Sequence, residues 1–274
     1  MIVKVLAEDT SESIGFIREH GLCLYIETKN HKILFDTGAS TIFAQNACKM
    51  NVDISEVDLV VISHGHYDHG GGLKTFLSIN SKAKVYCRQR AFEKHYSNRP
   101  NGVKEYIGLD ETILNNERFV FCEDCLAIDE ELELFSGVKG EKLSPPGNAN
   151  LFLKVGEDYL QDDFSHEQNL IISENGMTLL IVGCAHKGIV NIIEHFRFER
   201  GCLPDLIIGG FHLNYHGNNK NDNSDLVNEI GEFLLNTSTQ LYTCHCTGTK
   251  AYSRLKTIMG EKIEYLSTGN QLTI

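Results

Sequence analysis

One stretch of this chain, SHGHYDHGGG, limits what it can fold into more than any other feature. It contains His64, His66, Asp68 and His69, and it follows the apolar run 57–63, which predicts a buried strand. Two histidines two residues apart in a turn can reach one cation, and the aspartate and histidine that follow can turn toward a second. Imidazole and carboxylate groups bind borderline-soft divalent metals well, and the glycines allow a tight turn. The stretch therefore predicts a metal site at the end of a strand.

The rest of the sequence predicts an α/β protein. Strands are predicted over 2–6, 22–27, 32–35, 57–63, 84–87, 169–173, 177–182, 206–208, 240–243 and 262–266. Helices are predicted over about 40–50, 73–79, 187–198, 224–235 and 249–259. The dipeptide Asn175-Gly176 is a strong signal for a two-residue hairpin. No linker is visible, so we expect residues 1–274 to form a single domain, with a variable insert region at about 88–163.

Polar motifs directly follow predicted strands at five places, namely Asp36-Thr37-Gly38, His64–His69, Cys184–His186, Phe211-His212 and His245. In α/β folds, groups at the ends of neighbouring strands meet along one edge of the sheet and build the ligand site there. We therefore expect these five segments to converge.

Composition excludes several classes of protein. The 274 residues are 42% hydrophobic and 23% charged, which is typical of a globular protein and not of a disordered one. The net charge of −12 argues against nucleic acid or an anionic membrane as a partner. No apolar run could span a bilayer, and the start MIVKVLAEDT lacks the apolar stretch of a signal peptide. We expect a cytoplasmic protein that acts on a small molecule, and the sequence leaves its oligomeric state open.

The nine cysteines do not predict a disulfide framework, because their number is odd and no export signal is seen. Most are expected to be reduced thiols in the core. Cys244 and Cys246 flank His245, so in an extended strand they would point away from any metal that His245 binds.

The motif HxHxDH after an apolar strand resembles the signature of the metallo-β-lactamase fold superfamily, and the likeness extends over essentially the whole chain. More narrowly, SHGHYDHGGGL, VGCAHKGIVN, GGFHL and HCTGTKA resemble the branch related to an archaeal methanopterin-pathway enzyme. That enzyme, 7,8-dihydropterin-6-yl-methyl-4-(β-D-ribofuranosyl)aminobenzene 5'-phosphate synthase, joins a dihydropterin to ribofuranosylaminobenzene phosphate. The resemblance implies a four-layer αββα sandwich with the metal site along one edge of the two sheets.

The resemblance also implies roles for particular residues. His64 and His66 should bind a first metal, and Asp68, His69 and the later His245 a second. Asp68 should in addition take part in proton transfer. Asp36 in LFDTG should support the metal loop through hydrogen bonds.

Other positions do not match the superfamily pattern one to one. Cys184 stands where an acidic bridging ligand is usual, and it is either a thiolate ligand or a small buried residue. His186 is a metal ligand or a substrate contact, and His212 is a ligand or a group that donates a hydrogen bond to the substrate. The usual histidine before the strand at 177–182 has no clear counterpart. The weaker candidates near that position are His166, Asp162 and Asp163.

The site implies a metal-dependent hydrolase with a mono- or dinuclear centre that activates water against an ester, amide or phosphoryl group. Two divalent metals are expected, with zinc as the default and manganese or iron as alternatives. The main alternative is a pterin-linked transferase that releases pyrophosphate from a phosphorylated, pterin-like substrate. An alternative of another class is a non-catalytic sensor that binds a metal or ligand.

Overall fold

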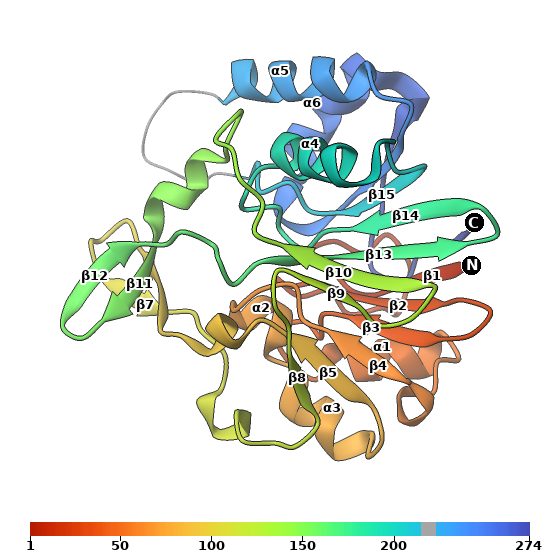
Figure 1. Ribbon diagram of the computed structural model, residues 1–274, viewed down its shortest axis with the longest axis vertical. Coiled ribbons are helices and arrows are strands. Elements are labelled where there is room, and N and C mark those ends of the chain that lie inside the picture. The colour runs from red at the N-terminus through yellow and green to blue at the C-terminus, as the bar shows by residue number, and fades with distance from the viewer. Residues whose placement is uncertain (215–222) are drawn as a thin grey trace.

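Two seven-stranded sheets pack face to face in the computed structural model, which describes residues 1–214 and 223–274 (Figure 1). The first sheet has the order β18-β1-β2-β3-β4-β5-β8. Its strands are β1 (Ile2–Ala7), β2 (Cys23–Glu27), β3 (Lys32–Phe35), β4 (Leu59–Val61), β5 (Lys84–Cys87), β8 (Phe119–Phe121) and β18 (Gln271–Thr273). From β3 to β8 neighbouring strands run parallel, so β3, β4 and β5 end at the same edge.

The second sheet has the order β17-β16-β15-β14-β13-β10-β9. Its strands are β9 (Cys125–Ala127), β10 (Leu132–Ser136), β13 (Gln168–Glu174), β14 (Met177–Ile181), β15 (Leu206–Gly209), β16 (Gln240–Thr243) and β17 (Ile263–Tyr265). Strands β14 to β17 are parallel. The β13–β14 hairpin pairs Glu174 with Met177, and the two residues between them have positive φ, as the Asn-Gly signal predicts.

Helices cover the outer faces of both sheets (Figure 1). The α-helices are α1 (Ile42–Lys49), α2 (Tyr67–Gly70), α3 (Leu73–Ile79), α4 (Ile189–Arg200), α5 (Ser224–Leu235) and α6 (Thr249–Met259). Short 3-10 turns are η1 (Ile54–Glu56), η2 (Gln89–Phe92), η3 (Glu111–Ile113), η4 (Pro146–Asn150), η5 (His245–Thr247) and η6 (Gly260–Lys262). No described helix combines the length and the apolar character needed to cross a membrane.

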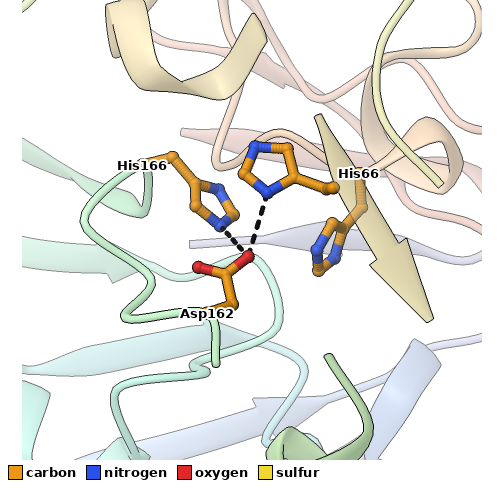
Figure 2. Close-up of side chains that lie close together, drawn as sticks. His66, Asp162 and His166 are labelled. Atoms are coloured by element: carbon orange, nitrogen blue, oxygen red, sulfur yellow. Dashed lines mark hydrogen bonds and ion pairs between the residues drawn. The ribbon is translucent and has the colours of Figure 1, made fainter. Parts of the chain in front are cut away.

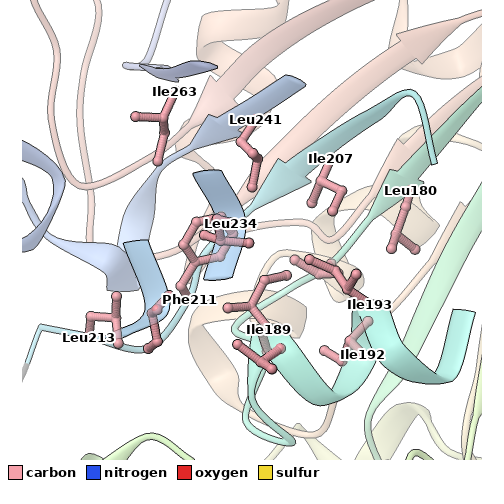
Figure 3. Packing of buried hydrophobic residues seen from close by; sticks show 14 of the residues in the cluster. Leu180, Ile189, Ile192, Ile193, Ile207, Phe211, Leu213, Leu234, Leu241 and Ile263 are labelled. Carbon is pink, nitrogen blue, oxygen red and sulfur yellow. The ribbon is translucent and has the colours of Figure 1, made fainter. Parts of the chain in front are cut away.

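Three apolar layers hold these elements together. The layer between the sheets contains, for example, Ile26 and Phe35 from the first sheet and Ile172 from the second, all fully buried. Figure 3 shows the layer under α4, where Ile192 and Ile193 of the helix belong to one buried cluster with Leu180 and other strand residues. The third layer lies between the first sheet and the helices α1 and α3. The predicted αββα layering is confirmed.

A third, smaller sheet lies beside the sandwich (Figure 1). It has the order β12-β11-β6-β7, with β6 (His95–Asn98), β7 (Lys104–Tyr106), β11 (Leu151–Val155) and β12 (Asp158–Gln161). The region 88–163 supplies all four of these strands and also β8, β9 and β10 of the two large sheets. The small sheet borders the cavity described below.

Candidate metal centre

The five polar segments that follow strands converge on one edge of the sandwich. Asp36 follows β3, His64 follows β4, Cys184 follows β14, His212 follows β15 and His245 follows β16. Most of these side chains are buried, and donor atoms from several segments lie within 4.8 Å of one another. The structure therefore brings together the segments that the strand-end pattern singled out.

The first group of donors consists of His64, His66 and His186, whose Nε2 atoms are buried and have no hydrogen-bond partner among the residues that the structure describes. The Ser63 hydroxyl donates to Asp36 Oδ2 (2.7 Å), so it accepts from His64 Nδ1 at 2.8 Å. That hydrogen bond places the ring proton on Nδ1 and leaves Nε2 with a free lone pair.

A side chain from another segment fixes the His186 ring so that its Nε2 atom is also free. Asn148, in η4, donates its amide N–H to the His186 carbonyl (2.7 Å), so its Oδ1 faces His186 Nδ1 at 2.9 Å. The Nδ1 proton is donated to that oxygen, and Nε2 is again free. Two rings thus present buried, unprotonated nitrogens to a common point, which is the donor arrangement a divalent cation requires.

The second group of donors surrounds His69 and His245. His69 Nδ1 lies 2.6 Å from Asp36 Oδ2, and His245 Nδ1 lies 2.5 Å from Asp9 Oδ1. Each ring donates Nδ1–H to a carboxylate, as metal-binding histidines usually do. The two Nε2 atoms then face each other at 3.2 Å. Two lone pairs at this distance repel each other unless a cation or a proton lies between them.

Asp68 and Cys184 complete the second group. Asp68 Oδ2 lies 3.4 Å from His245 Nε2 and 3.7 Å from His69 Nε2. Cys184 Sγ lies 3.2 Å from His69 Nε2 and also belongs to a donor group with His186 and His212. The thiol is therefore placed between the two groups, where the superfamily pattern has an acidic bridge. The donor set, made of imidazole, carboxylate and thiol, fits zinc.

The pKa shifts of the histidines agree with the division of the donors into two groups. Burial, followed by repulsion from neighbouring histidines, lowers the pKa of His64 and His186 well below its usual value, so both rings are neutral at neutral pH. Burial also lowers the pKa of His245, but the negative charges of Cys246, Asp68 and Asp9 outweigh it and raise this pKa well above its usual value. The raised pKa favours a protonated His245 ring, and a cation held by the second group would take the place of that proton.

One expectation about the cysteines is wrong. Cys246 does not point away from the site, because the chain leaves the extended conformation at His245 (φ 49°) and turns into η5. The sulfur of Cys246 lies within 4.8 Å of donor atoms of Cys184 and His245 and accepts from the His212 N–H at 3.3 Å. Cys244 is fully buried in the layer between the sheets.

A cavity of about 710 Å³ opens over both groups. His212 lines it, and its ring centre lies 4.2 Å from that of His186. The wall also contains Tyr67 and, from the region after β6, Arg99. The volume is within the usual range for a small-molecule site.

Sequence reasoning missed several groups that orient the candidate ligands. Asp9 lies two residues after β1 and could have been found by the strand-end rule; besides His245, it contacts His20 Nδ1 at 2.9 Å. Nothing in the sequence marks Asn148 or His95. Asp162 and His166, which were weak candidates, lie beside His66 in one buried group with His95 (Figure 2). Asp163 is exposed and bonds to Ser165.

Glu167 gives the site region a pH dependence. Its side chain is buried and accepts from the backbone N–H groups of His186 (2.6 Å) and Lys187 (3.0 Å). Burial outweighs these hydrogen bonds and raises the pKa of Glu167 from 4.5 to about 7. Between these two values the unfolded chain has released the proton and the folded chain has kept it. The free energy of unfolding therefore falls as the pH rises through this window.

We expect Glu167→Gln to remove this contribution. In the metal-free protein, the free energy of unfolding of the wild type should fall by roughly 3 kcal/mol more than that of the variant between about pH 4.5 and 7.5. Urea unfolding of both proteins at a series of pH values measures the difference. If the free energies of unfolding of the two proteins change with pH in parallel across this window, Glu167 titrates normally.

Comparisons with known proteins match this architecture. The sequence profile described as "Metallo-beta-lactamase superfamily" matches residues 17–153. An uncharacterized protein of Methanocaldococcus jannaschii is 29% identical over 262 residues, which cover 93% of each chain. From the same organism, 7,8-dihydropterin-6-methyl-4-(beta-D-ribofuranosyl)-aminobenzene-5'-phosphate synthase is 25% identical over 287 residues, covering 97% of this chain and 94% of that one.

Among solved structures, Tm1679, described as a metal-dependent hydrolase of the beta-lactamase superfamily, superposes with a TM-score of 0.84 at 29% identity, covering 100% of this chain and 99% of that one. The short form of human tRNase Z shares the fold at 12% identity, with a TM-score of 0.54 over 100% and 99% of the two chains.

Proposed function

The chain belongs to the metallo-beta-lactamase superfamily, and on that premise we propose that it is a metal-dependent hydrolase acting in the cytoplasm on a small-molecule ester, amide or phosphoryl compound. The observation that carries the proposal is the set of buried, unprotonated imidazole nitrogens beside the cavity. Among the described residues, the Nε2 atoms of His64 and His186 have no hydrogen-bond partner, while their Nδ1 atoms are held by fixed acceptors.

We assign His64, His66 and His186 to a first metal and Asp68, His69 and His245 to a second, with Cys184 between them. Zinc suits these donors best, and manganese or iron is the alternative. When bound, such metals lower the pKa of a water molecule toward about 7 and polarise the oxygen of the substrate.

The chain's own side chains then act around the reacting group. Asp68 lines the cavity and its Oδ2 lies 3.4 Å from His20 Nε2, so a proton taken up by Asp68 has a second acceptor at the cavity wall. His212 is placed to donate a hydrogen bond to the substrate, since its ring borders the same cavity. Asp36 and Asp9 hold the rings of His69 and His245.

A panel of ester, amide, phosphomonoester and phosphodiester substrates tests the proposal with purified protein reloaded with zinc, manganese or iron. We expect metal-dependent turnover of at least one class and its loss on chelation. Full metal occupancy and tight ligand binding without turnover on any member would instead indicate a sensor and overturn the hydrolase assignment.

A second candidate is a pterin-linked transferase, favoured by the likeness to the M. jannaschii synthase along almost its whole length. In that case the same residues would hold the metals, and the bound metals would assist a pyrophosphate leaving group instead of activating water. The cavity is large enough for two substrate halves, and Arg99, which is paired with Glu105, supplies a cation at its wall. Incubation with a dihydropterin diphosphate and an arylamine phosphate separates the two functions, because only the transferase releases pyrophosphate in step with coupled product.

A further inference from the structure

A buried group of polar side chains lies behind the first set of donors. Figure 2 shows Asp162 and His166 close to His66; His95 of β6 completes the group. All four side chains are almost fully removed from solvent. Asp162 Oδ2 lies 2.9 Å from His95 Nδ1 and 3.3 Å from His166 Nε2, and its Oδ1 accepts from the backbone N–H of Phe164 at 2.8 Å.

The hydrogen bonds of His166 show what this group does. Its Nδ1 lies 2.9 Å from the backbone nitrogen of Gly65. A backbone N–H can only donate, so Nδ1 is the acceptor and carries no proton. The neutral ring then carries its proton on Nε2 and donates it to Asp162. Although the four donor atoms are close enough for a cation, His166 has no free lone pair to offer one.

Gly65 is the residue between His64 and His66. A Cβ atom there would lie 2.3 Å from the Ala91 carbonyl oxygen and 2.8 Å from His95 Nε2. The loop thus lies directly against the segment that carries His95, and its central N–H is fixed by His166. A displacement of Gly65 would move both neighbouring histidines at once.

We propose that Asp162 and His166 are positioning residues for the metal-binding loop: Asp162 fixes the tautomer of His166, and His166 then holds the Gly65 N–H and with it His64 and His66. The inference rests on the proposed function, since it takes this loop to bind metal. The charge balance agrees: burial raises the pKa of Asp162, but hydrogen bonds from His166 and His95 outweigh it and keep the carboxylate ionised.

Asp162→Asn is the sharpest test, because it preserves the shape of the side chain while it removes the negative charge and turns the acceptor that faces His166 into a donor. The Phe164 N–H requires an acceptor, which orients the new amide with Oδ1 toward Phe164 and the NH₂ toward both His166 and His95. His166 must then accept at Nε2 and carry its proton on Nδ1, where it faces the Gly65 N–H. We expect a 10- to 100-fold weaker affinity for the first metal, roughly the usual loss when such a supporting residue is changed.

Asp163→Asn is the matched control, because the neighbouring carboxylate is exposed and bonds to Ser165 and Arg90. It should leave both metal affinities unchanged. Affinities are measured by chelator competition, and the visible spectrum of the cobalt-loaded protein reports the first site directly. Histidine ¹⁵N NMR reads the tautomer of His166 in the wild type without any variant.

The expected results are an Nε2–H tautomer for His166 in the wild type, its change in Asp162→Asn, and weaker binding of the first metal alone. The proposal is overturned by an Nδ1–H tautomer in the wild type, by unchanged affinity in the variant, or by loss of a third equivalent of metal, which would make the group a cation site.

If the wild type binds no metal at all, the proposed function fails. The network is then judged by His166's tautomer and by hydrogen exchange of the Gly65 amide, which should accelerate in the variant.

Discussion

Replacing His64 by alanine is expected to release one equivalent of metal and to lower turnover by at least about 10³-fold, which is about 4 kcal/mol of transition-state stabilisation. The reason is the position of the ring: Nδ1 is tied to Ser63, and Nε2 is buried, unprotonated and without any partner in the described part of the chain. Removing it takes one of three donors from the first site and leaves a space that water fills.

The measurements are metal content after dialysis and turnover on whichever substrate the panel identifies. His195→Ala is the control, since this histidine lies on α4 and stacks on Phe135, with ring centres 5.4 Å apart, away from the cavity. The control should keep its metal and its rate. A His64→Ala protein that retains both equivalents and most of its activity would remove this residue from the site.

Replacing Asp36 by alanine is expected to destabilise the fold by about 3–5 kcal/mol and to weaken both metals together. The carboxylate is fully buried and accepts from the Ser63 N–H (2.7 Å), the Ser63 hydroxyl (2.7 Å) and His69 Nδ1 (2.6 Å). It therefore supports the first group through Ser63 and the second through His69. Its positive φ of 60° adds strain for an alanine, because aspartate tolerates this conformation better.

Denaturant unfolding of the metal-free protein measures the first effect, and metal affinity measures the second. Asp58→Ala is the comparison: Asp58 is exposed and accepts from the Lys32 N–H at 2.8 Å, so its loss should cost no more than about 1 kcal/mol. Equal stability losses in the two variants would show that Asp36 is no more than an ordinary turn residue.

Local sequence signals predicted ten strands of the two large sheets and the strand-end segments, but not β8, β9, β10 or β18. The strand at 32–35 and the helices at 73–79 and 249–259 have the predicted bounds, because apolar periodicity and adjacent glycines define them within a few residues of chain. The convergence of His64, Cys184 and His245 followed from one rule about parallel strands, which needs no knowledge of side-chain contacts.

What the sequence could not provide depends on contacts between distant segments. Asn148 reaches His186 across 38 positions and His166 reaches Gly65 across 101, and neither has a local pattern that marks it. The small sheet is built from short strands in a region of mixed composition, so no periodicity predicts it. The error at Cys246 has a local cause, since strand alternation was extended beyond the point where the backbone turns.

The most direct test of the account is anomalous scattering from crystals grown with zinc. We predict two ions: one within about 2.0–2.2 Å of donor nitrogens of His64, His66 and His186, and one at the same distance from the Nε2 atoms of His69 and His245. Ions bound elsewhere, or donor groups that stay free of metal at saturating zinc, would contradict it.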